Sequence, residues 1–81
     1  MQVGVHFYSY FKDLAGCAQT SIALAENATI QDLAQHLCGR FPKWAPMQNS
    51  ALIAVGVEYQ GRDYVLKYGD EVSLFPPVQG G

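Results

Sequence analysis

Apolar residues occupy every second position in two segments near the start of the chain. Val3, Val5 and Phe7 form the first alternation, and residues 21–24 repeat it with an isoleucine and a leucine. A period of two is typical of a strand that buries one face, so both segments are predicted to be strands. Residues 11–16 between them read as a turn. The two strands are therefore expected to form a hairpin with a long connection.

From Thr29 the spacing of apolar residues changes to three and four, which is typical of an amphipathic helix. The apolar stripe consists of Ile30, Leu33, Ala34, Leu37, Cys38 and Phe41. The Thr29 hydroxyl can accept the backbone N–H of Asp32, whose carboxylate reaches back, so these residues are predicted to cap the helix start. Gly39 loosens the last turn, and Pro42 prevents a further one. This is the only clear helix in the sequence, and its stripe is expected to lie on a sheet.

After the helix, the chain is predicted to form a loop and then another strand. Residues 42–50 contain two prolines and Trp44, a composition that favours a loop pinned by one large apolar side chain. Residues 51–57 are almost continuously apolar, which favours a strand buried on both faces. Gln60 and Gly61 then end the segment that follows.

The last strand alternates again, with Val72 and Leu74 on one face and Ser73 and Phe75 on the other. The order of elements is therefore strand, strand, helix, strand, strand, which predicts an α+β fold with one main helix packed across one mixed β-sheet. This arrangement resembles the ubiquitin-like β-grasp. The resemblance implies that the first and last strands are parallel neighbours.

Composition narrows the range of partners. A net charge of -2 with five Lys and Arg residues gives no basic surface for nucleic acid or for an anionic membrane. No apolar run approaches the roughly 18 residues of a membrane span, and no signal sequence is expected before the first strand. Cys17 and Cys38 are too few for a secreted disulfide framework and are expected to be reduced thiols. The expected result is a cytoplasmic globular domain.

The usual signatures of catalysis and metal binding are missing from the sequence. His6 and His36 are isolated and fit no zinc-binding spacing. Ser9 and Ser50 lack the glycine pattern of a nucleophile elbow, and no glycine-rich loop precedes the helix to hold phosphate. The chain is therefore expected to have no catalytic residue, no metal site and no bound cofactor of its own.

The chemistry of the sequence is concentrated in its last residues. Residues 1–76 are expected to form the domain, and residues 77–81 are expected to form an extended C-terminal carrier tail. The tail and its root consist of Pro76, Pro77, Val78, Gln79, Gly80 and Gly81. Paired prolines keep such a segment extended, and glycines lack a Cβ, so the end of the tail can enter a narrow channel.

The group that a terminal glycine offers is its α-carboxylate. This group is ionised at neutral pH and resists attack by a thiolate, so it must first be activated. Adenylation with ATP in a partner enzyme supplies a leaving group, after which sulfur displaces AMP and leaves a thiocarboxylate on Gly81. ATP is thus expected to be bound by the partner and not by this chain.

Over essentially its whole length the sequence resembles the small subunit of molybdopterin synthase, the MoaD-like family. The most specific stretch consists of Gly69-Asp70-Glu71-Val72, then Phe75-Pro76-Pro77-Val78 and the final Gly80-Gly81. The resemblance implies a sulfur carrier for the molybdopterin dithiolene in molybdenum cofactor biosynthesis. It implies three partners: an ATP-dependent adenylating enzyme, a sulfur-donor system and the large subunit of the synthase.

The family also implies a hydrophobic docking patch on the sheet near the tail. Tyr8 and Phe75 are expected to face outward on adjacent strands, and Tyr59 is a third candidate. Large aromatic side chains suit an interface because they bury much area at a small entropic cost. Ordinary half-exposed strand surface is the alternative for the two tyrosines. Gly56 departs from the family, which commonly has asparagine there, so a side-chain contact at that turn is expected to be missing.

Three other functions stay open at this point. A sulfur carrier for thiamine synthesis shares the fold and the glycine end, although the proline pair and the greater length favour molybdopterin. A ubiquitin-like protein modifier would use the same adenylated glycine to acylate a lysine. A β-grasp interaction module would not use its terminus at all.

Overall fold

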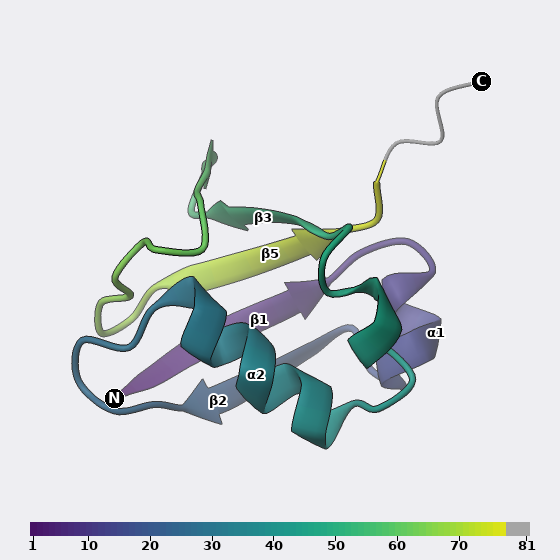
Figure 1. Ribbon diagram of the computed structural model, residues 1–81, viewed down its shortest axis with the longest axis horizontal. Coiled ribbons are helices and arrows are strands. Elements are labelled where there is room, and N and C mark those ends of the chain that lie inside the picture. The colour runs from purple at the N-terminus through teal and green to yellow at the C-terminus, as the bar shows by residue number, and fades with distance from the viewer. Residues whose placement is uncertain (78–81) are drawn as a thin grey trace.

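Five strands form one sheet, and a helix of 11 residues lies across one face of it (Figure 1). The computed structural model describes residues 1–77. The elements follow one another as β1 (Gln2–Phe7), α1 (Phe11–Ala15), β2 (Gln19–Ala23), α2 (Ile30–Arg40), the 3₁₀ helix η1 (Ala45–Met47), β3 (Leu52–Val55), β4 (Glu58–Tyr59) and β5 (Glu71–Phe75). The strand order across the sheet is β2-β1-β5-β3-β4.

The sheet is mixed, because the two ends of the chain run side by side in the same direction. β1 is antiparallel to β2 and parallel to β5, with Val5 opposite Val72. β5 is antiparallel to β3, with Leu74 opposite Ile53. These pairings confirm the predicted hairpin and the parallel neighbours that the resemblance implied. With α2 across the sheet, the architecture is the β-grasp.

The start and the end of α2 lie where the sequence predicts them. The Thr29 hydroxyl accepts the backbone N–H of Asp32 at 3.3 Å, and the Asp32 carboxylate accepts the backbone N–H of Thr29 at 2.9 Å. These two hydrogen bonds form a complete capping box, which satisfies backbone donors that the first turn leaves free. The helix ends at Arg40, with Phe41 as its C-cap ahead of Pro42. Local sequence therefore determines both ends of this helix.

The hydrophobic core fills the space between α2 and the inner face of the sheet. The helix contributes Ile30, Leu33, Ala34 and Leu37, and the strands contribute Val3, Val5, Phe7, Ile22, Ile53, Val72 and Leu74. All of these side chains are buried, and the transfer of their apolar surface out of water is the main force that holds helix and sheet together. Cys38 and Phe41, at the end of the predicted stripe, are only partly buried.

Trp44 anchors the loop that follows α2, as predicted. Its side chain is fully buried, and its ring makes edge-to-face contacts with Phe7 at 6.4 Å and with Phe11 at 5.9 Å between centroids. Aromatic rings favour this geometry because the positive edge of one ring meets the negative face of the other. The loop also contains η1, a short turn that the sequence did not predict.

The prediction of a turn at residues 11–16 was wrong, because this segment forms α1. Phe11 is fully buried beside Trp44, and Gly16 ends the helix with φ of 78°. A left-handed residue at this position is a common helix stop that glycine adopts without strain. A helix of five residues is too short to show a period, so its stability depends on the burial of Phe11.

The prediction of a strand buried on both faces at residues 51–57 was also wrong. β3 covers only the middle of this range, and the far end belongs to a turn in which Val57 is 99% exposed. Leu52 is exposed as well, because it points to the face of the sheet opposite α2. The strand β4, which the sequence did not predict, pairs with β3 after the turn and makes it a hairpin.

No helix among residues 1–77 is long and apolar enough to cross a membrane. Cys17 and Cys38 are free thiols. Burial raises the pKa of the Cys38 thiol, and the nearby charge of Arg62 opposes that shift in part. A raised pKa lowers the fraction of reactive thiolate at neutral pH, so Cys38 should react more slowly than an exposed cysteine.

Candidate functional site

Three aromatic side chains from three different parts of the chain meet on the outer face of the sheet, opposite α2. Tyr8 follows β1, Tyr59 ends β4 and Phe75 ends β5. The rings of Tyr8 and Phe75 are stacked, with centroids 4.7 Å apart and planes at 12°. Tyr59 meets the Phe75 ring edge-on at 6.4 Å and 69°. We call these three residues the aromatic cluster, and all three were predicted as interface candidates.

The register of the strands explains why the cluster faces outward. Leu74 is buried, so the neighbouring Phe75 points to the opposite face, and Leu52 lies directly across from it on β3. Tyr8 is 42% exposed and Tyr59 is 70% exposed. Exposed aromatics gathered in one place are a common mark of a protein-protein contact surface. The geometry therefore favours a docking patch over scattered strand surface.

The aromatic cluster borders the root of the predicted tail. Phe75 is the last residue of β5, which lies between β1 and β3, and Pro76 and Pro77 follow it directly (Figure 1). Proline has no backbone N–H to donate, so the ladder of β5 ends there. A protein that covered the cluster would therefore also lie next to the point where the chain leaves the sheet.

The predicted sulfur-carrying end lies outside the described residues. Val78, Gln79, Gly80 and Gly81 are the residues concerned, and of the predicted tail at 77–81 only Pro77 is described. Their roles stay predictions at this point.

The other half of the outer face is polar, and it contains a hydrogen-bonded pair that the sequence did not reveal. Nε2 of His6 on β1 lies 2.6 Å from Oε1 of Glu71 on β5. His6 is isolated in the sequence, because its partner is 65 residues away. Only the parallel pairing of β1 with β5 brings the two together.

Among the described residues no group of three or more His, Cys, Asp or Glu side chains converges as a metal site would require. His6 and Glu71 are two ligands at most, and structural metal ions in proteins usually need four.

The turn between β3 and β4 accounts for the departure at Gly56. Its φ is 61°, in the left-handed region, and its backbone N–H donates to the carbonyl of Glu71 at 3.0 Å. Glycine and asparagine are the residues that adopt this conformation most readily. Gly56 therefore adopts the conformation of this turn without strain, and it offers no side chain for a contact there.

Known proteins resemble the chain along its whole length. A family model described as the ThiS family matches residues 5–81. The molybdopterin synthase sulfur carrier subunit of Escherichia coli (strain K12) is 35% identical over 81 residues, which cover 98% of this chain and 99% of that protein.

Two solved structures extend the comparison. A Pyrococcus furiosus protein described as molybdopterin converting factor, subunit 1, is 32% identical with a TM-score of 0.88, and the match covers 96% of this chain and 99% of that one. SAMP1 of Haloferax volcanii has a TM-score of 0.89 over 100% of both chains. It is 21% identical, so this second likeness shows a shared fold alone.

Proposed function

This chain belongs to the ThiS family, and we propose that it is the sulfur carrier subunit of a molybdopterin synthase. The observation that carries the proposal is the extent of the similarity. The family match runs from residue 5 through Gly81, so it includes the double glycine as well as the folded domain. The relative from Escherichia coli carries the name of this function and matches almost end to end.

In the proposed reaction, Gly81 is the residue whose carboxylate is converted. A carboxylate oxygen attacks the α-phosphorus of ATP, pyrophosphate leaves, and an acyl adenylate forms in the active site of the adenylating enzyme. A sulfide equivalent (HS⁻) from the donor system then attacks the carbonyl carbon, the bond to AMP breaks, and the S–H proton is lost to water. The product is a thiocarboxylate, which gives its sulfur to the pterin precursor of the dithiolene in the large subunit.

In this proposal, the residues of the chain bind the partner proteins and present Gly81 to them, and the partners catalyse the reactions. The aromatic cluster supplies apolar area for docking, and β5 fixes the distance from that surface to Pro76 and Pro77. Large rings with few rotatable bonds are effective anchors because little side-chain entropy is lost when they are covered. We place the protein in the cytoplasm, where its partners have ATP, and we assign it no bound cofactor.

Intact-mass measurement tests the sulfur-carrier chemistry directly. After incubation with an adenylating enzyme, ATP and a sulfur donor, the chain should gain about 16 Da, because one oxygen is exchanged for sulfur. A variant with one alanine added after Gly81 is the matched control, since its fold is kept and its terminal glycine is blocked. An unchanged mass of the wild type, with an enzyme that loads a known carrier in the same tube, would contradict the proposal.

Genetic complementation separates the proposed pathway from the alternatives. The relative from Escherichia coli favours neither a thiamine sulfur carrier nor a protein modifier. The gene should restore growth of a strain that lacks its molybdopterin synthase small subunit and should not restore a thiamine auxotroph. The opposite pattern would transfer the same tail chemistry to thiamine synthesis.

A further inference from the structure

The strands of the sheet carry acidic residues but no lysine or arginine among the described residues. β4 and β5 each contain one glutamate, Glu58 and Glu71. Glu58 lies at the edge of the sheet, but Glu71 lies in its interior, on β5 between β1 and β3. Glu71 is therefore the carboxylate that a partner covering the outer face would meet.

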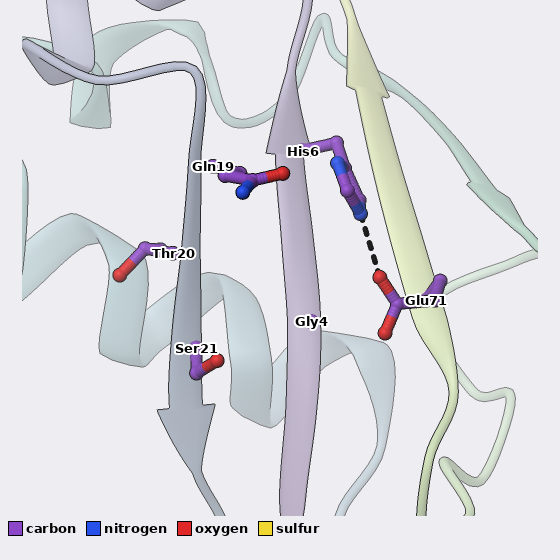
Figure 2. A pocket seen from close by; sticks show the side chains of 6 residues that line it. All are labelled: Gly4, His6, Gln19, Thr20, Ser21 and Glu71. Carbon is purple, nitrogen blue, oxygen red and sulfur yellow. Dashed lines mark hydrogen bonds and ion pairs between the residues drawn. The ribbon is translucent and has the colours of Figure 1, made fainter.

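The side chain of Glu71 lies flat on the sheet because the neighbouring strand has no side chain at the position opposite it. Gly4 lies opposite Glu71 in the parallel register of β1 and β5. A Cβ at position 4 would overlap both carboxylate oxygens, so the side chain of Glu71 can occupy this place only because position 4 is glycine. Figure 2 shows Glu71 extended toward Gly4 and His6 from the adjacent strand.

His6 holds the Glu71 carboxylate in place but uses only part of its hydrogen-bonding capacity. Its Nε2 lies 2.6 Å from Oε1 of Glu71, and within residues 1–77 no hydrogen bond reaches Oε2. The Glu71 side chain is 59% exposed, so the second oxygen is accessible to another molecule. An ionised carboxylate can accept about four hydrogen bonds, which leaves most of its capacity unused.

The surroundings of this carboxylate form a shallow pocket lined by polar groups. Its volume is about 270 Å³, and its lining consists of Gly4, His6, Gln19, Thr20, Ser21 and Glu71 (Figure 2). Hydroxyl and amide groups can turn an oxygen toward a bound donor, and the ionised carboxylate accepts only and contributes a negative charge. The complementary group is a cation with several donors and no acceptor, as found in arginine and lysine side chains.

The pocket is continuous with the aromatic cluster. Outward-facing positions alternate along each strand, so Glu71, Ser73 and Phe75 share one face of β5, and His6 and Tyr8 share the same face beside it. A partner that covers the cluster and extends along β1 and β5 must therefore reach the Glu71 pocket.

We propose that the Glu71 pocket receives an arginine or lysine side chain of the large subunit that docks on the aromatic cluster. This inference rests on the proposed function, which supplies the partner. The apolar half of the face provides contact area, and the charge at the polar half fixes the orientation of the partner. Complementary charges at an interface act in this way, through orientation and association rate more than through area.

Calorimetric titration of the large subunit with four variants tests the pocket. Glu71→Gln removes the charge, Glu71→Lys reverses it, and Gly4→Ala keeps every group but displaces the Glu71 side chain. Glu58→Gln, which removes the same charge from the edge strand β4, is the matched control. The fluorescence of Trp44, the single tryptophan and a buried one, verifies that each variant is folded.

Removal of the charge should weaken binding about tenfold or more, and the affinity of Glu71→Gln should depend less on salt than that of the wild type. Glu71→Lys should lose more affinity than Glu71→Gln, Gly4→Ala should lose less, and Glu58→Gln should bind like the wild type. A change of one basic residue of the large subunit to glutamate should restore binding of Glu71→Lys and would identify the occupant.

Wild-type affinity in both Glu71 variants, together with lost affinity in Tyr8→Ala, would overturn the inference and leave the proposed function intact. Failure of the wild type both to bind the large subunit and to gain sulfur mass would instead overturn the proposed function, and this inference with it.

Discussion

Phe7 and Tyr8 are consecutive aromatic residues, yet they belong to two different surfaces. Phe7 ends β1 on the inner face, is 1% exposed, and packs edge-to-face on Phe41 at 5.3 Å. Tyr8 points to the outer face, is 42% exposed, and stacks on Phe75. The strand pleat alone separates them. The inner face of the sheet holds the fold together, whereas the outer face presents apolar and charged groups that the fold itself does not need.

Truncation of the inner residue should have the largest effect on stability. Phe7→Ala removes a ring from the centre of the core and leaves a cavity beside Trp44, so the free energy of unfolding should fall by about 3–5 kcal/mol. Urea denaturation followed by Trp44 fluorescence measures this loss. A loss below about 1 kcal/mol would show that the core tolerates the cavity and that the two faces are less different than their burial indicates.

Truncation of the outer neighbour should cost much less stability. Tyr8→Ala removes one stacked pair at the surface, which predicts a loss of about 1 kcal/mol in the same denaturation experiment. Binding of the large subunit should nevertheless be lost, because the cluster is its proposed anchor. Loss of stability as large as for Phe7→Ala would mean that the cluster is a second core.

The His6–Glu71 pair should contribute still less to folding. Its side chains are 31% and 59% exposed, and solvent screens such pairs strongly, so Glu71→Gln should change the free energy of unfolding by at most about 1 kcal/mol. The change should shrink further when the denaturation is repeated at high salt. An effect that salt leaves untouched would argue that packing over Gly4, rather than charge, holds the side chain in place.

The smallest effect is expected from the Cys38 thiol, at the border of the core. Burial raises its pKa above the ordinary value of 9.0, so the folded chain keeps this proton to higher pH than the unfolded chain does. The corresponding stability is fully present below pH 9.0 and is lost as pH rises through the folded-state pKa. Iodoacetamide should therefore alkylate Cys38 more slowly in the native protein than in urea, and Cys38→Ser should remove the loss of stability that this thiol causes above pH 9.0.

The elements that the sequence predicts well are those whose determinants are local. The alternation in β1 and β5 and the capping box of Thr29 and Asp32 each lie within a few residues, and the structure has all of them. The short helix α1 was missed because its stability comes from Phe11, whose burial against Trp44 is a tertiary contact. The two residues of β4 are likewise too few to show a pattern and depend on the turn at Gly56.

The features of the candidate site also divide into those that local sequence predicts and those that depend on contacts between distant residues. Tyr8 and Phe75 could be assigned to the outer face from alternation alone, but the stacking of their rings required the register between β1 and β5. The hydrogen bond between His6 and Glu71 was invisible in the sequence, because the two residues lie at opposite ends of the chain. Pairings between distant strands are what single-sequence patterns leave undetermined.

The position of β5 has a mechanical consequence. This strand is hydrogen-bonded on both edges, to β1 and to β3, and it carries Pro76 and Pro77 at its end. A pull applied through Pro77 runs along the strand, so it loads both ladders in shear, and their bonds must yield together instead of opening one by one. A force on the end of β5 should therefore leave the sheet intact, where the same force on an edge strand would peel its ladder apart.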